Sequence, residues 1–153
     1  MIICMIMEQW IHDHFKSEPP EGIGGPVPLH EIEEAEKELG VKLPEDYKEY
    51  LHLYGSGGTP MYQVAGLRTA LFQPVTEHTF IELTKNLRPQ LPKKFQKMII
   101  IAVDYDANPI GFFPGESAIF VVDHHMNNQK VVLAKNFEEF VAKLITEEGF
   151  EGR

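Results

Sequence analysis

The chain has 153 residues, with 14 basic and 23 acidic side chains and a formal net charge of −9. At this length we expect a single domain over 1–153. Apolar residues make up 43% and charged residues 24%, which excludes a wholly disordered chain. The single cysteine, Cys4, excludes an intramolecular disulfide. The acidic balance excludes a general nucleic-acid binder, because neutralising phosphates requires surplus lysine and arginine.

The chain opens with an apolar run over 1–7. A membrane span needs about 20 such residues, and a signal peptide needs a basic segment that is missing here, so we expect no membrane association and a cytoplasmic protein. Apolar residues then recur at helical spacing, which predicts an N-terminal helix over 1–16 that packs on the core. The segment 17–28 holds four prolines and three glycines. That density forbids a helix or a central strand, so we expect a surface loop.

Two amphipathic helices follow the loop. The first is predicted over 29–39, with Gly40 as its C-cap. The second is predicted to open with Pro44 and to end at Gly55. It carries an aromatic stripe, which we expect to pack in the core with its hydroxyls at the rim: Tyr47, Tyr50 and Tyr54.

The second half of the chain changes from helical to strand patterning. Weaker signals suggest short strands at 61–64 and 67–72 and a helix over 74–87. Four apolar or β-branched segments separated by turn residues then predict strands at 98–103, 110–113, 118–122 and 130–134. A last helix begins near Asn136, a good N-cap residue. This order predicts an α+β fold with N-terminal helices, a central and mostly antiparallel sheet, and a closing C-terminal helix.

Charge is unevenly distributed along the chain. Residues 29–54 hold eight acids and three bases, a balance of −5, and residues 104–153 hold nine and four, again −5. Between them, residues 55–103 hold two acids and six bases, a balance of +4. One interpretation is a set of solvated helix faces. The other is an acidic surface that steers a basic partner into contact.

Two short motifs suggest metal chemistry. Carboxylates at Asp104 and Asp106 have the alternate spacing of a calcium loop, but Pro109 stands where such a loop needs glycine, which favours a simple turn between strands. Asp123 and His124, followed by a second histidine, resemble the start of the DHH phosphoesterase motif, for which Asp104 and Asp106 could supply further ligands. That resemblance covers three residues, and an exposed hairpin turn is the alternative.

No other segment assembles a catalytic or metal site. His12 and His14 lie two residues apart, so on a helix they point in different directions. Cys4 has no adjacent base and is interpreted as a core residue. The turn around Ser56 follows a helix, whereas a nucleophile elbow follows a strand. We therefore expect no cofactor, no bound metal and no enzymatic activity.

The segment 32–51, followed by 54–58, resembles the SUKH superfamily, which includes fungal cell-wall assembly regulators and bacterial immunity proteins. The matching positions are Ile32, Glu33, Leu39, Gly40, Leu43, Pro44, Tyr47, Leu51, Gly57 and Gly58. A later block extends the resemblance to about 29–146. It includes Gly111, in the second of the four predicted strands, and the closing helix. Ser56 departs from the pattern, since the family often has asparagine there, and the loop 17–28 has no counterpart.

The resemblance implies a SUKH-like fold and a non-catalytic binding protein, commonly one that neutralises a toxin by occluding it. With the acidic charge, it suggests a protein toxin, such as a basic nuclease, as partner. Five residues in loops beside the sheet are the candidate partner contacts: Asp104, Tyr105, Asp106, Glu116 and Asp123. The alternatives are an intracellular regulatory scaffold of the cell-wall regulator type, and the metal-dependent phosphoesterase.

Overall fold

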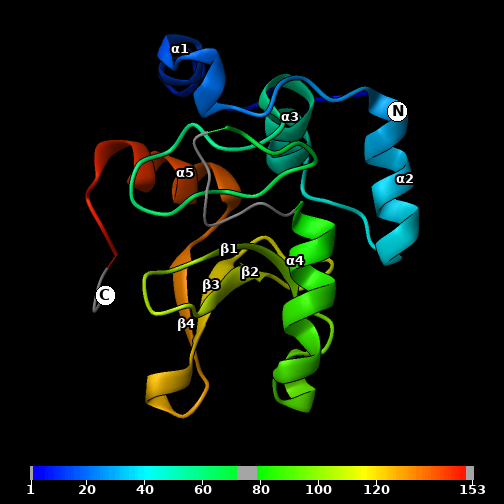
Figure 1. Cartoon of the computed structure of the whole chain (residues 1–153), viewed down its shortest axis with the longest axis vertical. Coiled ribbons are helices and arrows are strands. Elements are labelled where there is room, and N and C mark those ends of the chain that lie inside the picture. Colours follow the sequence, from blue (N-terminus) through cyan, green and yellow to red (C-terminus); the bar gives the residue numbers. More distant parts are fainter. Residues whose placement is uncertain (1, 72–78, 151–153) are drawn as a thin grey trace.

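The structure, a computed structural model, describes residues 2–71 and 79–150. Its α-helices are α1 (Gln9–Ser17), α2 (Leu29–Leu39), α3 (Glu45–Tyr54), α4 (Phe80–Leu87) and α5 (Phe137–Thr146). Its strands are β1 (Ile99–Val103), β2 (Pro109–Phe112), β3 (Ile119–Asp123) and β4 (Gln129–Ala134). Short 3₁₀ turns are η1 (Pro20–Gly22), η2 (Arg88–Gln90), η3 (Lys93–Phe95) and η4 (His124–Met126). This is the predicted α+β order of helices, sheet and closing helix (Figure 1).

The four strands form one antiparallel sheet in the order β1-β2-β3-β4. All four predicted strands are confirmed, with ends that differ by a residue or so. Each is joined to the next by a turn or short loop, so the β1–β2 and β3–β4 turns lie at one end of the sheet and the β2–β3 loop lies at the other.

The outer edge of β1 is covered, which explains why its apolar run is buried although it is an edge strand. The Thr84 hydroxyl of α4 accepts a hydrogen bond from Ile100 N at 2.9 Å and lies 3.3 Å from Ile100 O. Ala65 N donates to Ile101 O at 2.7 Å. These contacts satisfy backbone groups that an edge strand leaves open. Residues 61–64 pass beside β1 but do not form a strand, so the prediction of a strand there was wrong.

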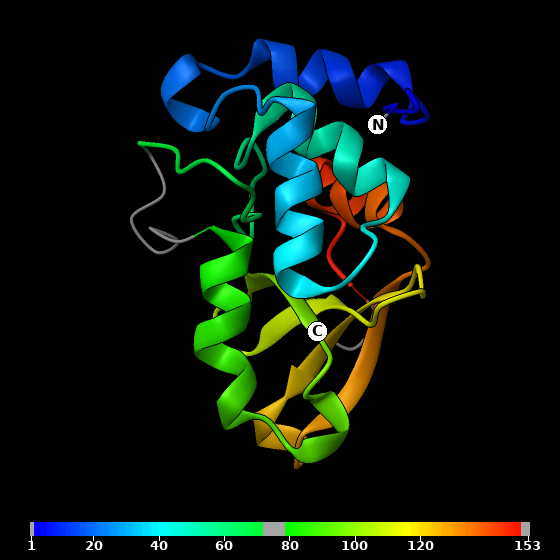
Figure 2. The same ribbon diagram turned by 90° about the vertical axis from the view of Figure 1, so that its right-hand side faces the viewer.

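The helices form layers above one face of the sheet. Figures 1 and 2 show α3 and α5 lying between the sheet and α1, with α4 beside β1 and α2 on the flank of α3. Nearly all the buried apolar residues form one cluster that extends from Met7 to Phe150. Within residues 2–71 and 79–150, none of the helices has the length and apolar character needed to cross a membrane.

The aromatic stripe of α3 lies at the centre of this core. Tyr47 and Tyr50 are fully buried, and Tyr54 is 5% exposed. The Tyr47 hydroxyl donates to Ala65 O at 2.7 Å, and the Tyr50 hydroxyl donates to Gly57 O at 2.9 Å. The expectation that these hydroxyls reach the rim was wrong. Both hydroxyls are buried, and each donates to a carbonyl of the chain that follows α3, so their burial leaves no polar group unsatisfied.

Glycine sets the ends of both predicted helices. Gly40 caps α2 in the left-handed conformation, as predicted, and α3 begins at Glu45, one residue after Pro44. Gly55 ends α3 with a φ of +79°, and a Cβ there would lie 2.0 Å from Gly25 O. The close approach of these two backbone segments therefore requires glycine at Gly55.

The N-terminal helix is shorter than predicted, because α1 begins at Gln9 and residues 2–8 are not helical. Ile2, Met5 and Ile6 are exposed, and so is Cys4, so the interpretation of Cys4 as a core residue was wrong. The end of this segment is held by a buried carboxylate on α3, which we call the buried anchor. Glu49, which is fully buried, accepts hydrogen bonds from Ile6 N at 2.7 Å and Met7 N at 3.1 Å.

His12 completes this anchor. It is 6% exposed and lies between Glu49 and Tyr54, at 2.5 Å from an oxygen of each. His12, Glu49 and Tyr54 thus join α1 to α3 through buried polar groups that satisfy one another. Burial, with smaller contributions from the charges of Glu49 and Asp13, raises the pKa of Tyr54 to about 12.

The loop 17–28 is held against the end of α3. Gly25 N donates to Tyr54 O at 2.8 Å, Val27 N donates to His52 O at 3.1 Å, and the Val27 side chain is 1% exposed. The predicted surface loop is only partly right, because Ser17 belongs to α1, the 3₁₀ helix η1 lies within the segment, and part of the segment is buried.

Two further predictions fall in the middle of the chain. Residues 67–71 are not a strand, and residue 72 of that prediction lies outside the described residues. Of the helix predicted over 74–87, α4 forms the last eight residues behind a capping box of Thr79 and Glu82. Residues 74–78 lie outside the described residues.

Candidate protein-binding site

The β1–β2 turn is built around Asp104. Its Oδ1 accepts from Asp106 N at 3.0 Å and from Asn108 N at 2.9 Å, and its Oδ2 accepts from Asn108 Nδ2 at 3.1 Å. This is the simple turn that the sequence favoured over a calcium loop. Ala107 adopts a φ of +63°, a conformation that is uncommon for any residue but glycine. The turn therefore holds Tyr105 outward, with its side chain 77% exposed.

The chain after α3 forms the facing wall. Gly58 has a φ of +78°, and a Cβ there would lie 2.7 Å from the Phe15 ring, so the turn requires glycine. The Thr59 hydroxyl then donates to Tyr62 O at 2.9 Å, and Met61 adopts a φ of +68°. This path brings Met61 and Tyr62 beside the β1–β2 turn.

The two walls enclose an apolar depression of about 430 Å³, which we call the tyrosine hollow. Its lining consists of Met61, Tyr62, Gln63, Val103, Asp104, Tyr105 and Ala107. Tyr62 packs edge-on against Tyr105 with 5.2 Å between ring centroids, and it stacks on Phe150 at 6.1 Å. The aromatic contacts fix the position of the wall while leaving the Tyr105 ring open to solvent.

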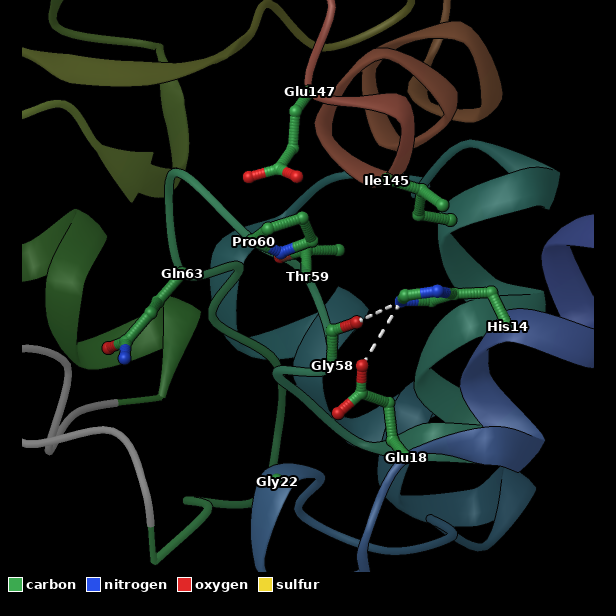
Figure 3. A pocket seen from close by; sticks show the side chains of 9 residues that line it. All are labelled: His14, Glu18, Gly22, Gly58, Thr59, Pro60, Gln63, Ile145 and Glu147. Carbon is green, nitrogen blue, oxygen red and sulfur yellow. Dashed lines mark hydrogen bonds and ion pairs between the residues drawn. The ribbon is translucent and has the colours of Figure 1, made fainter.

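A second depression, of about 450 Å³, lies beside the first, and we call it the glutamate hollow (Figure 3). It is lined by His14, Glu18, Gly22, Gly58, Thr59, Pro60, Gln63, Ile145 and Glu147. Gln63 lines both hollows. His14 Nε2 lies 2.6 Å from Gly58 O and 3.3 Å from Glu18 Oε1, and Figure 3 shows Glu147 on the opposite wall, at the end of α5.

Neither hollow contains a recognisable catalytic arrangement. In the part of the chain that the structure describes, no three histidine, cysteine, aspartate or glutamate side chains converge as metal ligands. Three of the four residues of the phosphoesterase hypothesis hold local structure: Asp104 organises the β1–β2 turn, Asp123 accepts from His125 N at 2.9 Å, and His124 N donates to Asn108 Oδ1 at 2.9 Å. The buried Ser56 hydroxyl packs against Gly24, with no base beside it among the described residues.

The structure separates the five predicted contact residues into two regions. Asp104, Tyr105, Asp106 and Asp123 lie at the end of the sheet that carries the β1–β2 and β3–β4 turns, and His124 links these two turns through Asn108. Of this group, Tyr105 and Asp106 are exposed, whereas Asp104 and Asp123 are each 8% exposed. Glu116 is exposed in the β2–β3 loop at the opposite end. Glu116 stays a predicted contact, at the end of the sheet opposite to the other four residues.

Sequence reasoning missed the facing wall and the second hollow. The sequence predicts a strand over 61–64, and no motif in it marks Glu18 or Glu147. The local signal for the wall was the glycine-rich turn followed by Thr59 and Pro60, which redirects the chain. No local pattern places residues from α1, this turn and the end of α5 side by side.

The site consists of two open, adjacent hollows and an exposed tyrosine on an α+β domain. The family model SUKH_6, described as SMI1-KNR4 cell-wall, matches residues 29–141. The chain therefore belongs to the SUKH superfamily, as the sequence motifs indicated, and domains of this family are generally non-catalytic. A search among curated proteins finds no match to the sequence.

Proposed function

We propose that this SUKH domain is an immunity protein that neutralises a cognate bacterial toxin by direct binding, without catalysis of its own. The observation that carries the proposal is the exposed Tyr105 ring beside the tyrosine hollow, on a domain of this family. Aromatic side chains at well-formed depressions supply much of the energy of protein interfaces. Asp106 and Tyr105, both predicted as contacts, belong to this surface.

The charge of the chain favours a basic partner. The net charge of −9 produces a negative field around the molecule, and carboxylates from Glu18, Asp106 and Glu147 lie at or next to the two hollows. Such a surface speeds association with a positively charged protein, and screening by salt weakens that effect. A toxin with a basic surface, such as a nuclease, fits these properties.

Co-expression tests the proposal. The toxin encoded next to this gene is expressed in a sensitive host with and without this protein, and an unrelated toxin serves as the specificity control. We expect growth to recover only with the cognate toxin and the two proteins to copurify as a complex. Continued growth arrest, together with the absence of a complex, would reject toxin neutralisation.

A second candidate is a regulatory scaffold, which the cell-wall description of the matched family favours. A scaffold would bind an endogenous protein in cells that encode no neighbouring toxin. Crosslinking through a photoreactive group at position 105, followed by mass spectrometry, separates the two functions. Recovery of a host regulatory protein in place of a toxin would support the scaffold.

A further inference from the structure

We propose that the two hollows form one docking surface for a protein segment in which an apolar side chain lies next to an arginine or lysine. This inference rests on the proposed function and specifies the partner's contact chemistry. The apolar side chain would enter the tyrosine hollow, and the basic side chain would reach the glutamate hollow. Gln63, which lines both hollows, marks the border between the two positions.

The backbone of the tyrosine hollow indicates a functional surface. Both of its walls contain a residue other than glycine with positive φ, namely Met61 at +68° and Ala107 at +63°. Each such conformation costs of order 1 kcal/mol or more, and these conformations concentrate at binding sites. Here they maintain a depression whose wall is a tyrosine with 77% of its surface exposed. An apolar side chain placed against Tyr105 would remove that ring from water.

The charges around the hollows select the neighbouring side chain. Glu18 and Glu147 line the glutamate hollow, and Asp106 is exposed in the turn that carries Tyr105. An arginine or lysine would meet carboxylates on two sides of this hollow, where His14 is the only basic side chain in the lining and contacts Gly58 O and Glu18. A segment with an acid at the same position would be repelled, so charge complementarity favours a basic occupant.

The shape of the surface favours a polypeptide over a small molecule. The two depressions, of about 430 Å³ and about 450 Å³, are both open to solvent and lie side by side. Two neighbouring side chains of one segment can therefore fill both at once. A stable interface buries about 800 Å² on each partner, so the hollows would form the centre of a larger contact.

A peptide titration tests this chemistry without the toxin. The probe is acetyl-Gly-Arg-Leu-Arg-Gly-amide, and the control is the same peptide with glutamate in place of both arginines. We expect NMR shift changes in the ¹⁵N-labelled protein at 61–63, 103–107 and 147, with a dissociation constant in the millimolar range. We expect the control to bind about tenfold more weakly or worse. Equal responses to both peptides, or shift changes confined to other surfaces, would overturn the inference.

Variants of the full protein then test the surface in the toxin complex. We expect Tyr105→Ala and Asp106→Lys each to raise the dissociation constant about tenfold or more. The matched controls are Val132→Ala, at a side chain that is 58% exposed on β4, and Glu34→Lys on the outer face of α2, with less than a twofold effect expected. All four side chains are partly or fully exposed, so the variants should fold.

The outcomes separate the two proposals. If the wild-type complex forms and Tyr105→Ala and Asp106→Lys bind as tightly as the controls do, toxin neutralisation stands and the docking surface is wrong. If the wild type forms no complex and gives no growth rescue, toxin neutralisation is wrong, and the peptide titration still decides whether the hollows bind a basic–apolar segment.

Discussion

The buried anchor between α1 and α3 leads to a sharp stability prediction. Glu49 has no exposed surface, and its carboxylate accepts hydrogen bonds from Ile6 N and Met7 N and contacts His12. Glu49→Gln removes the negative charge and leaves His12 facing an amide. Removing the carboxylate from this buried hydrogen-bond network leaves donors unsatisfied, which costs about 1–3 kcal/mol for each of them. That is a large part of the 5–15 kcal/mol that stabilises a typical domain.

The matched control lies on the same helix. Glu45 pairs with Lys48 at 2.8 Å, but its side chain is 46% exposed, so Glu45→Gln should cost no more than about 1 kcal/mol. Urea unfolding of both variants measures the difference, and the melting temperature of Glu49→Gln should fall by about 10 °C. Hydrogen exchange at the Ile6 and Met7 amides should also accelerate. Equal losses in the two variants would refute the anchoring role of Glu49.

Three further predictions concern other parts of the account. Thr84→Val should lower the free energy of unfolding by about 1–3 kcal/mol, measured in urea, because it leaves the Ile100 backbone groups without the Thr84 hydroxyl. Stability should fall as pH rises above 10, since the unfolded chain loses the Tyr54 proton near its ordinary pKa of 10.0 and the folded protein keeps it to about 12. Tyr54→Phe should reduce this slope, by up to about 1.4 kcal/mol per pH unit. Association with a basic toxin should slow as NaCl increases, measured by stopped flow.

Each of these has a result that would contradict it. Unchanged stability of Thr84→Val would mean that α4 does not protect the β1 edge. An alkaline slope that is the same with and without the Tyr54 hydroxyl would mean that this phenol is not desolvated. Association rates that are independent of salt would remove the electrostatic part of the functional proposal.

Local patterns were sufficient to predict much of the fold. The α2 and α3 helices carry apolar stripes and end at glycines, and the four strands are short β-branched or apolar runs between turn residues. These signals depend on residues that are close in sequence. The predicted helix over residues 2–7 failed because apolar side chains alone do not make a helix, and here the backbone of Ile6 and Met7 is drawn to Glu49, more than 40 residues away.

The remaining errors have a similar cause. Residues 61–64 look like a strand, but their path is set by the hydroxyls of Tyr47 and Tyr50, which bond to carbonyls of Gly57, Val64 and Ala65. The candidate site was half predicted, because the turn with Tyr105 and Asp106 is a local feature. Its facing wall and the glutamate hollow depend on contacts among segments far apart in the chain, which no spacing rule indicates.

Hydrogen exchange of the protein bound to its toxin tests the central claim most directly. If the molecule acts by presenting the two hollows to a basic partner, amides at 58–63 and 103–107 should gain protection in the complex, while those in α2 should not change. Protection confined to other surfaces, or no complex with the toxin at all, would contradict the account.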